Sequence, residues 1–452
     1  MFNSSHSFSL TRIQRSIFSS YWSLSVYFKL TEPILGIVRK QNENDSHFRY
    51  SEDMGKTRRD VNTDVCIVGA GPHGLAATLL FERIDPSIRV VVLDQSNEWL
   101  KSWKKQFRQA EIATLRSPIV HHPSPDSFAL DDFVKREDFP LSGLPYNPPT
   151  TEAFEAFCSE IINTSSIDDP VVAIPRSIRC EGDYVIIDSH AKTIHARYLI
   201  IASNPQQVII PQWAESIYHQ TNLVQHSVEI DLANTNDIAG QKIVVIGGGL
   251  TAAHLTRSAL DKGALVEMIL RRPLQIRNFD TDPGWLGPKY LNNYYAETDA
   301  HRRIELAREA RNGGSIPPWM RDSLVDYEKD GNLKIRESQE VTSAKLTSPD
   351  RYELSLSDGD RIDVDQVWLA TGTHSSLHAM ECLRPFLHDI TFIDGFPVTN
   401  NSLRLCEEPI YVMGRSATFA LGPSAGNLWG ATRAARRIAS DITGVELITN
   451  GS

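Results

Sequence analysis

Three glycines near the start of the folded sequence have the spacing that suits a phosphate-bearing ligand. They are Gly69, Gly71 and Gly74, in the segment CIVGAGPHGLAATLL, where an apolar strand runs directly into a helix. The first glycine permits the tight bend, the second lets the backbone approach a pyrophosphate, and the third lets helix and strand pack closely. The pyrophosphate then lies against the free N–H groups at the positive end of the helix dipole. Pro72 and His73, inside the loop, are expected to line the same site.

An acidic residue follows where such a site needs one. Asp94 ends the second apolar strand, RVVVLDQ, 20 residues beyond Gly74. A carboxylate at this position hydrogen-bonds the ribose hydroxyls of a dinucleotide. With strand, helix and acid in place, the segment predicts a dinucleotide site rather than a packing turn.

A second fingerprint occurs in the segment KIVVIGGGLTAAHLTRSALDKG. Gly247 and Gly249 take the first two roles, and Ala252, a permitted small residue, takes the third. The strand that follows ends in Arg271 and Arg272 instead of an acid. A guanidinium at this position suits a 2′-phosphate, which predicts NADPH over NADH. The alternative is that one or both arginines are solvated surface charges.

Each fingerprint is followed by a β-meander and then by a strand with a related ending, LIIASN in the first unit and VWLATG in the second. Two such units predict an α/β fold with two Rossmann-like dinucleotide-binding domains that carry inserted β-meanders. Thr371, in the second ending, is a candidate cofactor-binding residue. An acid-type first site and a basic-type second site suggest FAD in the first domain and NADPH in the second.

The FAD-binding domain is expected to be discontinuous, because the last strand and helix of the chain complete it. Those elements place Leu421 and Gly422, in the segment that runs to Asn427, near a helix N-terminus, where they face the negative end of a reduced flavin. The expected divisions are an N-terminal extension, the first part of the FAD-binding domain, the NADPH-binding domain and the second part of the FAD-binding domain, at residues 1–60, 61–235, 236–360 and 361–452.

Composition excludes several classes of function. The chain has 452 residues, of which 41% are apolar and 23% charged, as in an ordinary globular protein. A net charge of −10 without a long basic block argues against nucleic acid and anionic membrane as partners. The apolar stretch at residues 21–38 is broken by Lys29, Glu32 and Pro33, well short of the ~20 residues of a spanning helix, which argues against stable membrane insertion. The five cysteines are scattered and form no C-x-x-C pair, which favours a reducing compartment and removes the dithiol of a thioredoxin-reductase-like enzyme. No cysteine and histidine spacing predicts a metal site.

The first residues differ from the rest. The segment MFNSSHSFSLTRIQRSIFSSYWSLSVYFKL has nine serines, two arginines, one lysine and no acid, and so resembles an organelle transit peptide. The interpretation that we favour is a disordered extension, or a start at Met54. We therefore expect a cytoplasmic protein, with an organelle as the alternative.

These features together resemble the class B flavoprotein monooxygenases, which include flavin-containing monooxygenases, Baeyer–Villiger enzymes and lysine or ornithine N-hydroxylases. The resemblance covers roughly residues 61–440 and is carried by GAGPHGL, GGGLTAAHL, VWLATGT and IATLRSPIVHHPSPDSFALDDF. It implies that NADPH reduces FAD and that the reduced flavin uses dioxygen to oxygenate a bound nitrogen, sulfur or carbonyl group. Trp103, and Arg116 in LRSP, become candidate cofactor contacts. The alternatives are a core aromatic cluster for Trp103 and a buried structural ion pair for Arg116.

The departures from these families concern the substrate. Ala110 and Glu111 stand where the N-hydroxylases usually carry a Lys-Asp pair. The flavin-containing monooxygenase signature keeps its histidine as His226, but Gln220 and Asn222 replace its Phe and Gly. The resemblance therefore implies the cofactor scaffold and leaves the substrate open.

The expected function is a FAD-dependent, NADPH-reduced monooxygenase acting on a small molecule and dioxygen, with amine N-hydroxylation as the first substrate class. No catalytic side chain is identified, and the oligomeric state is open. The alternatives are an NAD(P)H-dependent flavin oxidoreductase or oxidase without oxygen insertion, and a regulatory or redox-sensing flavoprotein. Asp280 and Asp282, in NFDTDPGW, either bind a cationic substrate or, as we favour, cap and solvate a loop.

Overall fold

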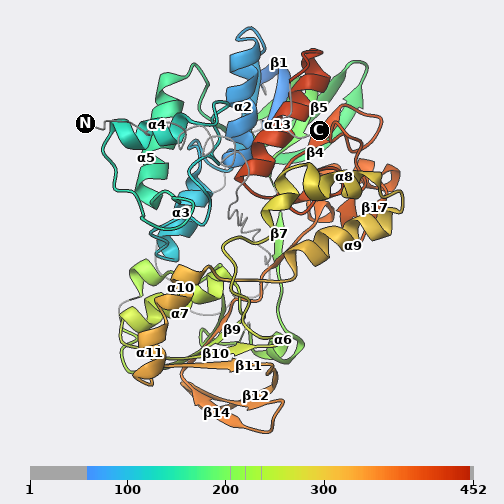
Figure 1. Ribbon diagram of the computed structural model, residues 1–452. Helices are drawn as coiled ribbons and strands as arrows, with labels where there is room; N and C mark the ends of the chain where they lie inside the picture. Colours follow the sequence, from blue (N-terminus) through green and yellow to red (C-terminus); the bar gives the residue numbers. More distant parts are fainter. Residues whose placement is uncertain (1–58, 204, 219, 236, 448–452) are drawn as a thin grey trace, which may run out of the picture.

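The computed structural model describes residues 59–203, 205–218, 220–235 and 237–447. These residues form two lobes, each built on a mainly parallel sheet (Figure 1). The expected N-terminal extension, residues 1–60, lies outside the described residues except for Arg59 and Asp60, which belong to the first strand.

The sheet of the first lobe consists of β1 (Arg59–Val68), β2 (Val90–Asp94), β3 (Val171–Val172), β4 (Pro175–Glu181), β5 (Tyr184–Ser189), β6 (Lys192–Ile201) and β19 (Ile410–Val412). Its order is β3-β2-β1-β6-β5-β4, and β19 pairs with β6. Strands β3, β2, β1, β6 and β19 are parallel, whereas β4, β5 and β6 form an antiparallel meander. Strand β6 therefore pairs along one edge with β5 first and then with β19, which comes from the end of the chain.

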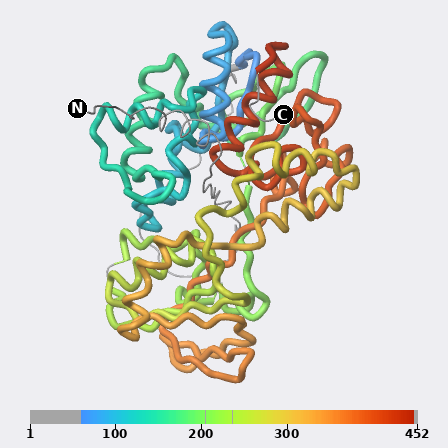
Figure 2. Tube along the Cα trace, in the orientation of Figure 1, coloured from blue at the N-terminus to red at the C-terminus, as the bar shows by residue number. Residues whose placement is uncertain are grey.

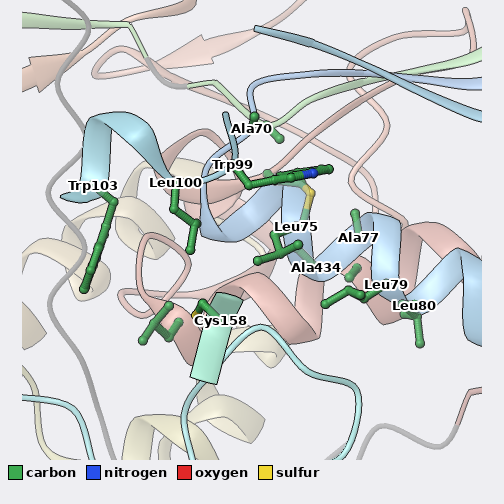
Figure 3. Close-up of a cluster of buried hydrophobic side chains, with 14 of the residues drawn as sticks. Ala70, Leu75, Ala77, Leu79, Leu80, Trp99, Leu100, Trp103, Cys158 and Ala434 are labelled. Atoms are coloured by element: carbon green, nitrogen blue, oxygen red, sulfur yellow. The ribbon is translucent and has the colours of Figure 1, made fainter. Parts of the chain in front are cut away.

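Helices cover this sheet on one face. They are α2 (Pro72–Ile84), α3 (Lys101–Gln109), α4 (Ala129–Arg136), α5 (Thr151–Thr164) and α13 (Leu428–Thr443). Helix α2 presents Leu75 and Leu79, four residues apart, to an apolar cluster that α13 shares through Ala434 (Figure 3). A second cluster on the other face packs the meander against the 3-10 helix η5 (Glu381–Asp389). Apolar side chains thus cover both faces, as a parallel sheet requires.

The second lobe repeats the plan with β8 (Val224–His226), β9 (Lys242–Ile246), β10 (Leu265–Leu270), β11 (Leu333–Glu337) and β15 (Gln366–Leu369). The order is β11-β10-β9-β15-β8, and every pair is parallel. Its helices are α6 (Gln212–Tyr218), α7 (Leu250–Asp261), α10 (Pro318–Asp322) and α11 (Val325–Lys329). An antiparallel meander of β12 (Val341–Ser348), β13 (Arg351–Leu356) and β14 (Arg361–Val364) packs on this lobe.

The two lobes are joined by a short antiparallel pair, β7 (Gln206–Val208) and β16 (Thr373–Ser375). Figure 1 places β7 in the narrow region between them. The backbone N–H of Ile209 donates to the carbonyl of Gly372 at 3.0 Å, which extends the pairing by one further bond.

Helices α8 (Pro288–Ala296) and α9 (Ala300–Arg311) leave the second lobe and pack on the first. Both figures of the whole chain place them beside the C-terminal elements of the first lobe (Figures 1 and 2). The hydroxyl of Tyr294 donates to the carbonyl of Thr418 at 2.8 Å, in α12 (Thr418–Leu421). Ile304 is buried with two apolar residues of the first lobe, Ile393 and Phe419.

The predicted fold class is confirmed: two Rossmann-like units carry meanders, and the first is completed by the end of the chain. The predicted divisions at 235/236 and 360/361 do not follow the sheets, however. Strand β8 lies within 61–235 and β15 within 361–452, yet both belong to the second sheet. These strands have three and four residues, and their local pattern shows strand character without showing the partner. In the described part of the chain, no helix is long and apolar enough to cross a membrane.

Candidate cofactor sites

The first glycine loop connects β1 to α2 at the carboxyl edge of the first sheet. Gly69 has a φ of +114°, and a Cβ on it would lie 2.8 Å from the backbone nitrogen of Ser203. A Cβ on Gly74 would overlap the carbonyl oxygen of Gly69. The close approach of these backbones requires glycine at both positions. Gly71 is the N-cap of α2 and supplies no side-chain cap, so the first N–H groups of the helix are available to a ligand.

The second loop has the same geometry. Gly247 has a φ of +137°, and a Cβ on it would lie 2.5 Å from the carbonyl oxygen of Ala370. Its N–H donates to the carbonyl of Ile269 at 3.1 Å, just as the N–H of Gly69 donates to that of Leu93 at 2.8 Å. The two glycine loops that the sequence predicts as a repeat therefore share the same backbone hydrogen bond as well as the same sequence motif.

The third position differs between the two loops. Ala252 lies fully buried in the apolar cluster between α7 and its sheet, so its methyl group fits where the first loop allows none. Gly249 is the N-cap of α7 and, like Gly71, leaves the helix without a side-chain cap. The first turn of α7 is thus a second place where backbone N–H groups can receive a phosphate.

Asp94 lies at the end of β2, beside the first loop. Its Oδ2 accepts from the backbone N–H of Ala70 at 3.0 Å, and its Oδ1 accepts from that of Ser96 at 3.0 Å. With Gly69 and Gly71 it lines a small hollow at the end of the sheet. The carboxylate is therefore fixed at the place where ribose hydroxyls would bind.

Pro72 and His73 form the start of α2. Pro72 occupies the first helical position, where its missing N–H costs no hydrogen bond. A ring N–H of His73 donates to the carbonyl of Ala425, with Nε2 3.2 Å from the oxygen. Burial lowers the pKa of His73 to about 4, against the opposing effect of this hydrogen bond, so the ring is neutral at pH 7. His73 thereby connects the first glycine loop to the C-terminal segment.

The C-terminal segment from Leu421 leads into the N-terminus of α13. Leu421 is fully buried, Gly422 has a φ of +79°, and α13 begins directly after Asn427. The Oδ1 of Asn427 accepts from the N–H of Gly430 at 3.0 Å and so caps the helix. The contact of His73 with Ala425 brings this helix end close to that of α2.

A cleft of about 470 Å³ lies beside the second glycine loop and reaches the first lobe. Its walls carry four arginines, of which two were expected and two were not: Arg271, Arg272, Arg311 and Arg415. Thr371 also lines it and donates its hydroxyl to the carbonyl of Ile209 at 2.5 Å. Asp280 is the one acidic residue among the described residues of this lining. The cleft is therefore strongly basic and suits a ligand with several phosphates.

Asp280 is already paired. Its Oδ1 lies 2.5 Å from Nη1 of Arg116 and its Oδ2 lies 3.4 Å from Nη2 of Arg311. Asp282 accepts from the backbone N–H of Gly284 at 2.7 Å and caps a short 3-10 helix. The loop-capping interpretation thus holds for Asp282, while Asp280 belongs to a partly buried ion cluster with Arg116 and Arg311.

The expected cofactor contact of Arg116 is corrected by its hydrogen bonds. Its side chain is 1% exposed. All five donors are used: Nε to Asn278 O, Nη1 to Asp280 Oδ1 and Ser315 O, and Nη2 to Arg277 O and Ser315 Oγ. A guanidinium has five N–H groups, so Arg116 has none left for a phosphate or a flavin. It is a structural residue that positions the segments around the cleft.

Trp103 is corrected in the same way. Its ring stacks on Phe107 with centroids 3.9 Å apart and lies 5.0 Å from Phe154. It is 1% exposed and lines neither the hollow nor the cleft. Of the two interpretations of this residue, the core cluster is the one that these contacts support. Figure 3 shows Trp103 among other buried side chains of the first lobe.

Arg415 is the residue that sequence reasoning missed most clearly. It follows β19, and its Nη1 lies 3.5 Å from the carbonyl of Thr373 in the connection between the lobes. A Cβ on Gly426 would lie 2.7 Å from its Cγ, so the arginine packs against the segment before α13. Burial, aided by Arg311 and opposed by Asp280, lowers its pKa to about 10, which keeps it charged at pH 7. The one sequence signal was a basic residue directly after the buried strand IYVMG.

His226 and Glu111, which stand at motif positions of the flavin-containing monooxygenases and the N-hydroxylases, have structural roles. A ring N–H of His226, at the end of β8, donates to the carbonyl of Gly372, with Nε2 3.1 Å from the oxygen. Glu111 lies 3.1 Å from Nζ of Lys262, which connects the first lobe to the end of α7. Both residues therefore act at the junction of the lobes.

His121 and His122 are buried in the first lobe and have neutral rings at pH 7. Burial lowers the pKa of His121 to about 3, with a contribution from His122, and it lowers that of His122 to about 4. Within residues 59–447, apart from the gaps already given, no three His, Cys, Asp or Glu side chains gather as metal ligands would.

The pH dependence of stability follows from His121. A folded-state pKa below the unfolded value of about 6.5 means that stability is full above pH 6.5 and falls as the pH drops toward 3. Between pH 7 and 5 this one histidine should remove about 2 kcal/mol of unfolding free energy. We expect His121→Gln to lose correspondingly less over that interval in urea unfolding, whereas His301→Gln, at an exposed position, should behave as the parent. Equal pH slopes in all three proteins would contradict the assignment.

Comparison with known sequences places the chain among nucleotide-dependent oxidoreductases. The family model described as pyridine nucleotide-disulphide oxidoreductase matches residues 66–311. The probable indole-3-pyruvate monooxygenase YUCCA9 of Arabidopsis thaliana is 23% identical over 440 residues, which covers 89% of this chain and 94% of that protein.

Comparison with solved structures gives the same architecture. The ornithine N-hydroxylase of Kutzneria sp. 744 superimposes with a TM-score of 0.70 at 18% identity, over 85% of this chain and 99% of its own. The cadaverine monooxygenase of the desferrioxamine pathway of Erwinia amylovora gives a TM-score of 0.69 at 18% identity, over 85% and 95%. At these identities the likeness establishes the two-lobed fold.

Proposed function

Because this chain belongs to the pyridine nucleotide-disulphide oxidoreductase family, we propose that it is a FAD-dependent, NADPH-reduced monooxygenase of a small molecule. The observation that carries the proposal is the pair of matched glycine loops, one beside an acidic residue and the other beside an arginine-lined cleft. The five cysteines contain no C-x-x-C pair, which argues against dithiol–disulphide exchange as the reaction.

The first lobe has the groups that FAD needs. The N–H groups at the start of α2, with Gly69 and Gly71, would bind the pyrophosphate, and Asp94 would bind the ribose. The capped N-terminus of α13 would lie toward the negative end of the flavin. His73, neutral and hydrogen-bonded to the carbonyl of Ala425, holds the N-terminal ends of α2 and α13 close to each other.

The second lobe has the groups that NADPH needs. Gly247 and Gly249 would let the pyrophosphate approach the first turn of α7. Arg271 and Arg272, at the end of β10, would bind the 2′-phosphate. Asp280 is the one carboxylate in the described lining of the cleft, and its ion pairs with Arg116 and Arg311 offset its repulsion of a ligand with three phosphates.

When bound, the reduced flavin would carry out the chemistry with dioxygen. The chain contributes binding and charge. Arg415 lies just after β19, packs against the segment before α13 and lines the cleft, where it carries a positive charge. We propose that this charge helps to hold the anionic groups of both cofactors in one arrangement.

Two substrate classes are supported by different relatives. An amine is favoured by the N-hydroxylase-like segment at residues 112–133 and by the fold shared with the ornithine and cadaverine enzymes. A 2-oxo acid is favoured by the likeness to the indole-3-pyruvate monooxygenase. We keep amine N-hydroxylation as the first proposal. Asp280 would not anchor the amine, because Arg116 and Arg311 already neutralise it.

The test is reduction of the purified protein by NADPH without air, followed by mixing with oxygen in a stopped-flow spectrometer. We expect NADPH to reduce the flavin. After oxygen is added, a spectrum distinct from both the oxidised and the reduced flavin should persist. With the right substrate present, NADPH consumption should match product formation. Ornithine, lysine, cadaverine and indole-3-pyruvate are the first compounds to compare.

Each other outcome selects a different function. An immediate return to oxidised flavin, with every substrate and without one, would mean an oxidoreductase or oxidase that inserts no oxygen. Bound FAD that NADPH does not reduce would mean a regulatory or redox-sensing flavoprotein. Either result would overturn the monooxygenase proposal.

A further inference from the structure

The cleft beside the second glycine loop has a wall that comes from a distant part of the chain. Residues 312–315, with the sequence NGGS, follow α9 and line the cleft opposite the end of β10. Asn312 is the C-cap of α9 with a φ of +44°, and Gly313 has a φ of +77°. Two successive residues in the left-handed region turn the chain sharply at the end of the helix. We call residues 312–315 the NGGS turn.

The NGGS turn packs directly on the proposed pyrophosphate site. A Cβ on Gly314 would lie 2.6 Å from the Cα of Gly249 and 3.0 Å from its nitrogen. Gly249 is the N-cap of α7. The two backbones are therefore in contact at the point where the helix begins, and the turn has a defined position relative to the N–H groups of α7.

The other end of the turn is anchored as well. Arg116 donates to both the carbonyl and the hydroxyl of Ser315, at 3.0 and 2.9 Å. The N–H of Ile316 donates to Gln275 O and the carbonyl of Ile316 accepts from the N–H of Arg277, each at 2.9 Å. The turn is thus joined to the same segment, just after β10, that carries the two arginines.

Arg272 lies against this turn. Its Nη1 donates to Oδ1 of Asn312 at 3.4 Å, and a Cβ on Gly313 would overlap its Nη2. The guanidinium of Arg272 therefore lies over the backbone of Gly313. The amide oxygen of Asn312 is its one hydrogen-bond acceptor there, so its other N–H groups can donate to a ligand. Such contact before binding lowers the cost of ordering a long side chain on a phosphate.

We propose that Arg272, held by Asn312 and Gly313, is the reader of the 2′-phosphate, and that Gly313 is a specificity-determining positioning residue. The inference rests on the proposed NADPH site and goes beyond it by naming one of two arginines and the turn that places it. Arg271 lines the same cleft and contributes general attraction to anions.

Gly313→Ala separates this role from a merely structural one. The atom that its methyl group would meet is the far end of a flexible side chain, so the guanidinium moves and the backbone of the cleft stays. Gly331 gives a matched control, because its φ is also +77° and a Cβ on it would meet nothing within 4 Å. Gly331→Ala therefore carries the same backbone strain without displacing Arg272.

The measurement is calorimetric titration of the FAD-loaded protein with NADP⁺ and with NAD⁺, which reads binding without turnover. We expect Gly313→Ala and Arg272→Ala to lower the ratio of NADP⁺ to NAD⁺ affinity by roughly tenfold to a hundredfold, as for the loss of charge-assisted hydrogen bonds to one phosphate. Gly331→Ala and Arg271→Ala should change that ratio much less. Affinity for NAD⁺ itself should stay close to that of the parent in Gly313→Ala, Arg272→Ala and Gly331→Ala, whereas Arg271→Ala should weaken both nucleotides alike.

A parent that prefers NADP⁺, with Gly313→Ala indistinguishable from Gly331→Ala, would overturn this inference and leave the proposed function intact. A parent without preference for NADP⁺ would overturn the NADPH assignment itself. If Gly313→Ala does not fold, Asn312→Gly removes the acceptor while glycine keeps the left-handed conformation. An unchanged ratio in that variant, together with equal effects of Arg271→Ala and Arg272→Ala, would likewise overturn the inference.

Discussion

Alanine in place of Gly69 is expected to give a folded protein that no longer retains FAD. The added Cβ would lie 2.8 Å from the nitrogen of Ser203 and 3.0 Å from Cα of the same residue. Both are backbone atoms of the loop after β6, so no side chain can move aside. The turn must open, and its N–H groups leave the proposed pyrophosphate. Two lost charge-assisted hydrogen bonds, at about 1.5–3 kcal/mol each, correspond to at least a hundredfold weaker binding.

The measurement is the ratio of flavin to protein after purification, with circular dichroism as the check on folding. Gly359→Ala is the control, since Gly359 has a φ of +93° and open space where a Cβ would lie. It carries the strain of a left-handed alanine without the collision. Retention of FAD by Gly69→Ala at the level of the control would refute the assignment of this loop.

Methionine in place of Arg116 is expected to destabilise the protein by about 3–5 kcal/mol. The substitution leaves Asp280 with only the longer contact to Arg311, at 3.4 Å, and deprives three carbonyl groups of their donor. Those carbonyls belong to Arg277, Asn278 and Ser315, on the two segments that line the cleft. Affinity for NADP⁺ should fall with stability, because the NGGS turn loses an anchor.

Urea unfolding followed by tryptophan fluorescence measures the first effect, and calorimetric titration measures the second. Arg136→Met serves as the comparison, because Arg136 is also ion-paired, with Glu137 and Glu160, but at the surface with a side chain 54% exposed. Exposed pairs contribute about 0–1 kcal/mol. Similar losses of unfolding free energy in the two variants would show that the hydrogen bonds of Arg116 stabilise the protein no more than a surface ion pair does.

The parts of the fold that sequence predicts are those governed by local sterics. The turn at Gly69 and the turn at Gly247 each need a left-handed glycine between a buried strand and a helix, and that requirement appears directly in the letters. The same holds for Asp94, whose distance from Gly74 along the chain follows from the length of one helix and one strand. The helix N-terminus after Asn427 is a third case, and an asparagine there suits an N-cap.

The parts that it does not predict depend on partners far away in the chain. Arg116 has its acceptors more than 160 residues later, and no local pattern distinguishes a guanidinium with all donors used from one facing a ligand. Trp103 is similar, because its core role is decided by Phe154 in another helix. Residues 311–313 end α9, and only their position beside Arg271 and Arg272, which follow β10, makes them part of a basic cleft.

Helices α8 and α9 follow the second lobe in sequence but pack on the first lobe, and this limits how the chain can be divided. A fragment cut at the two connecting strands β7 and β16 would still carry both helices, with Tyr294 deprived of its acceptor in α12 and Ile304 of its apolar neighbours. The second lobe is therefore not an autonomous module. A chimaera that takes this lobe from a relative must also take the surface of the first lobe on which α8 and α9 pack. Alternatively, it must keep α8 and α9 of the protein that supplies the first lobe. Chimaeras that join at the narrow connection alone would expose an apolar surface and aggregate.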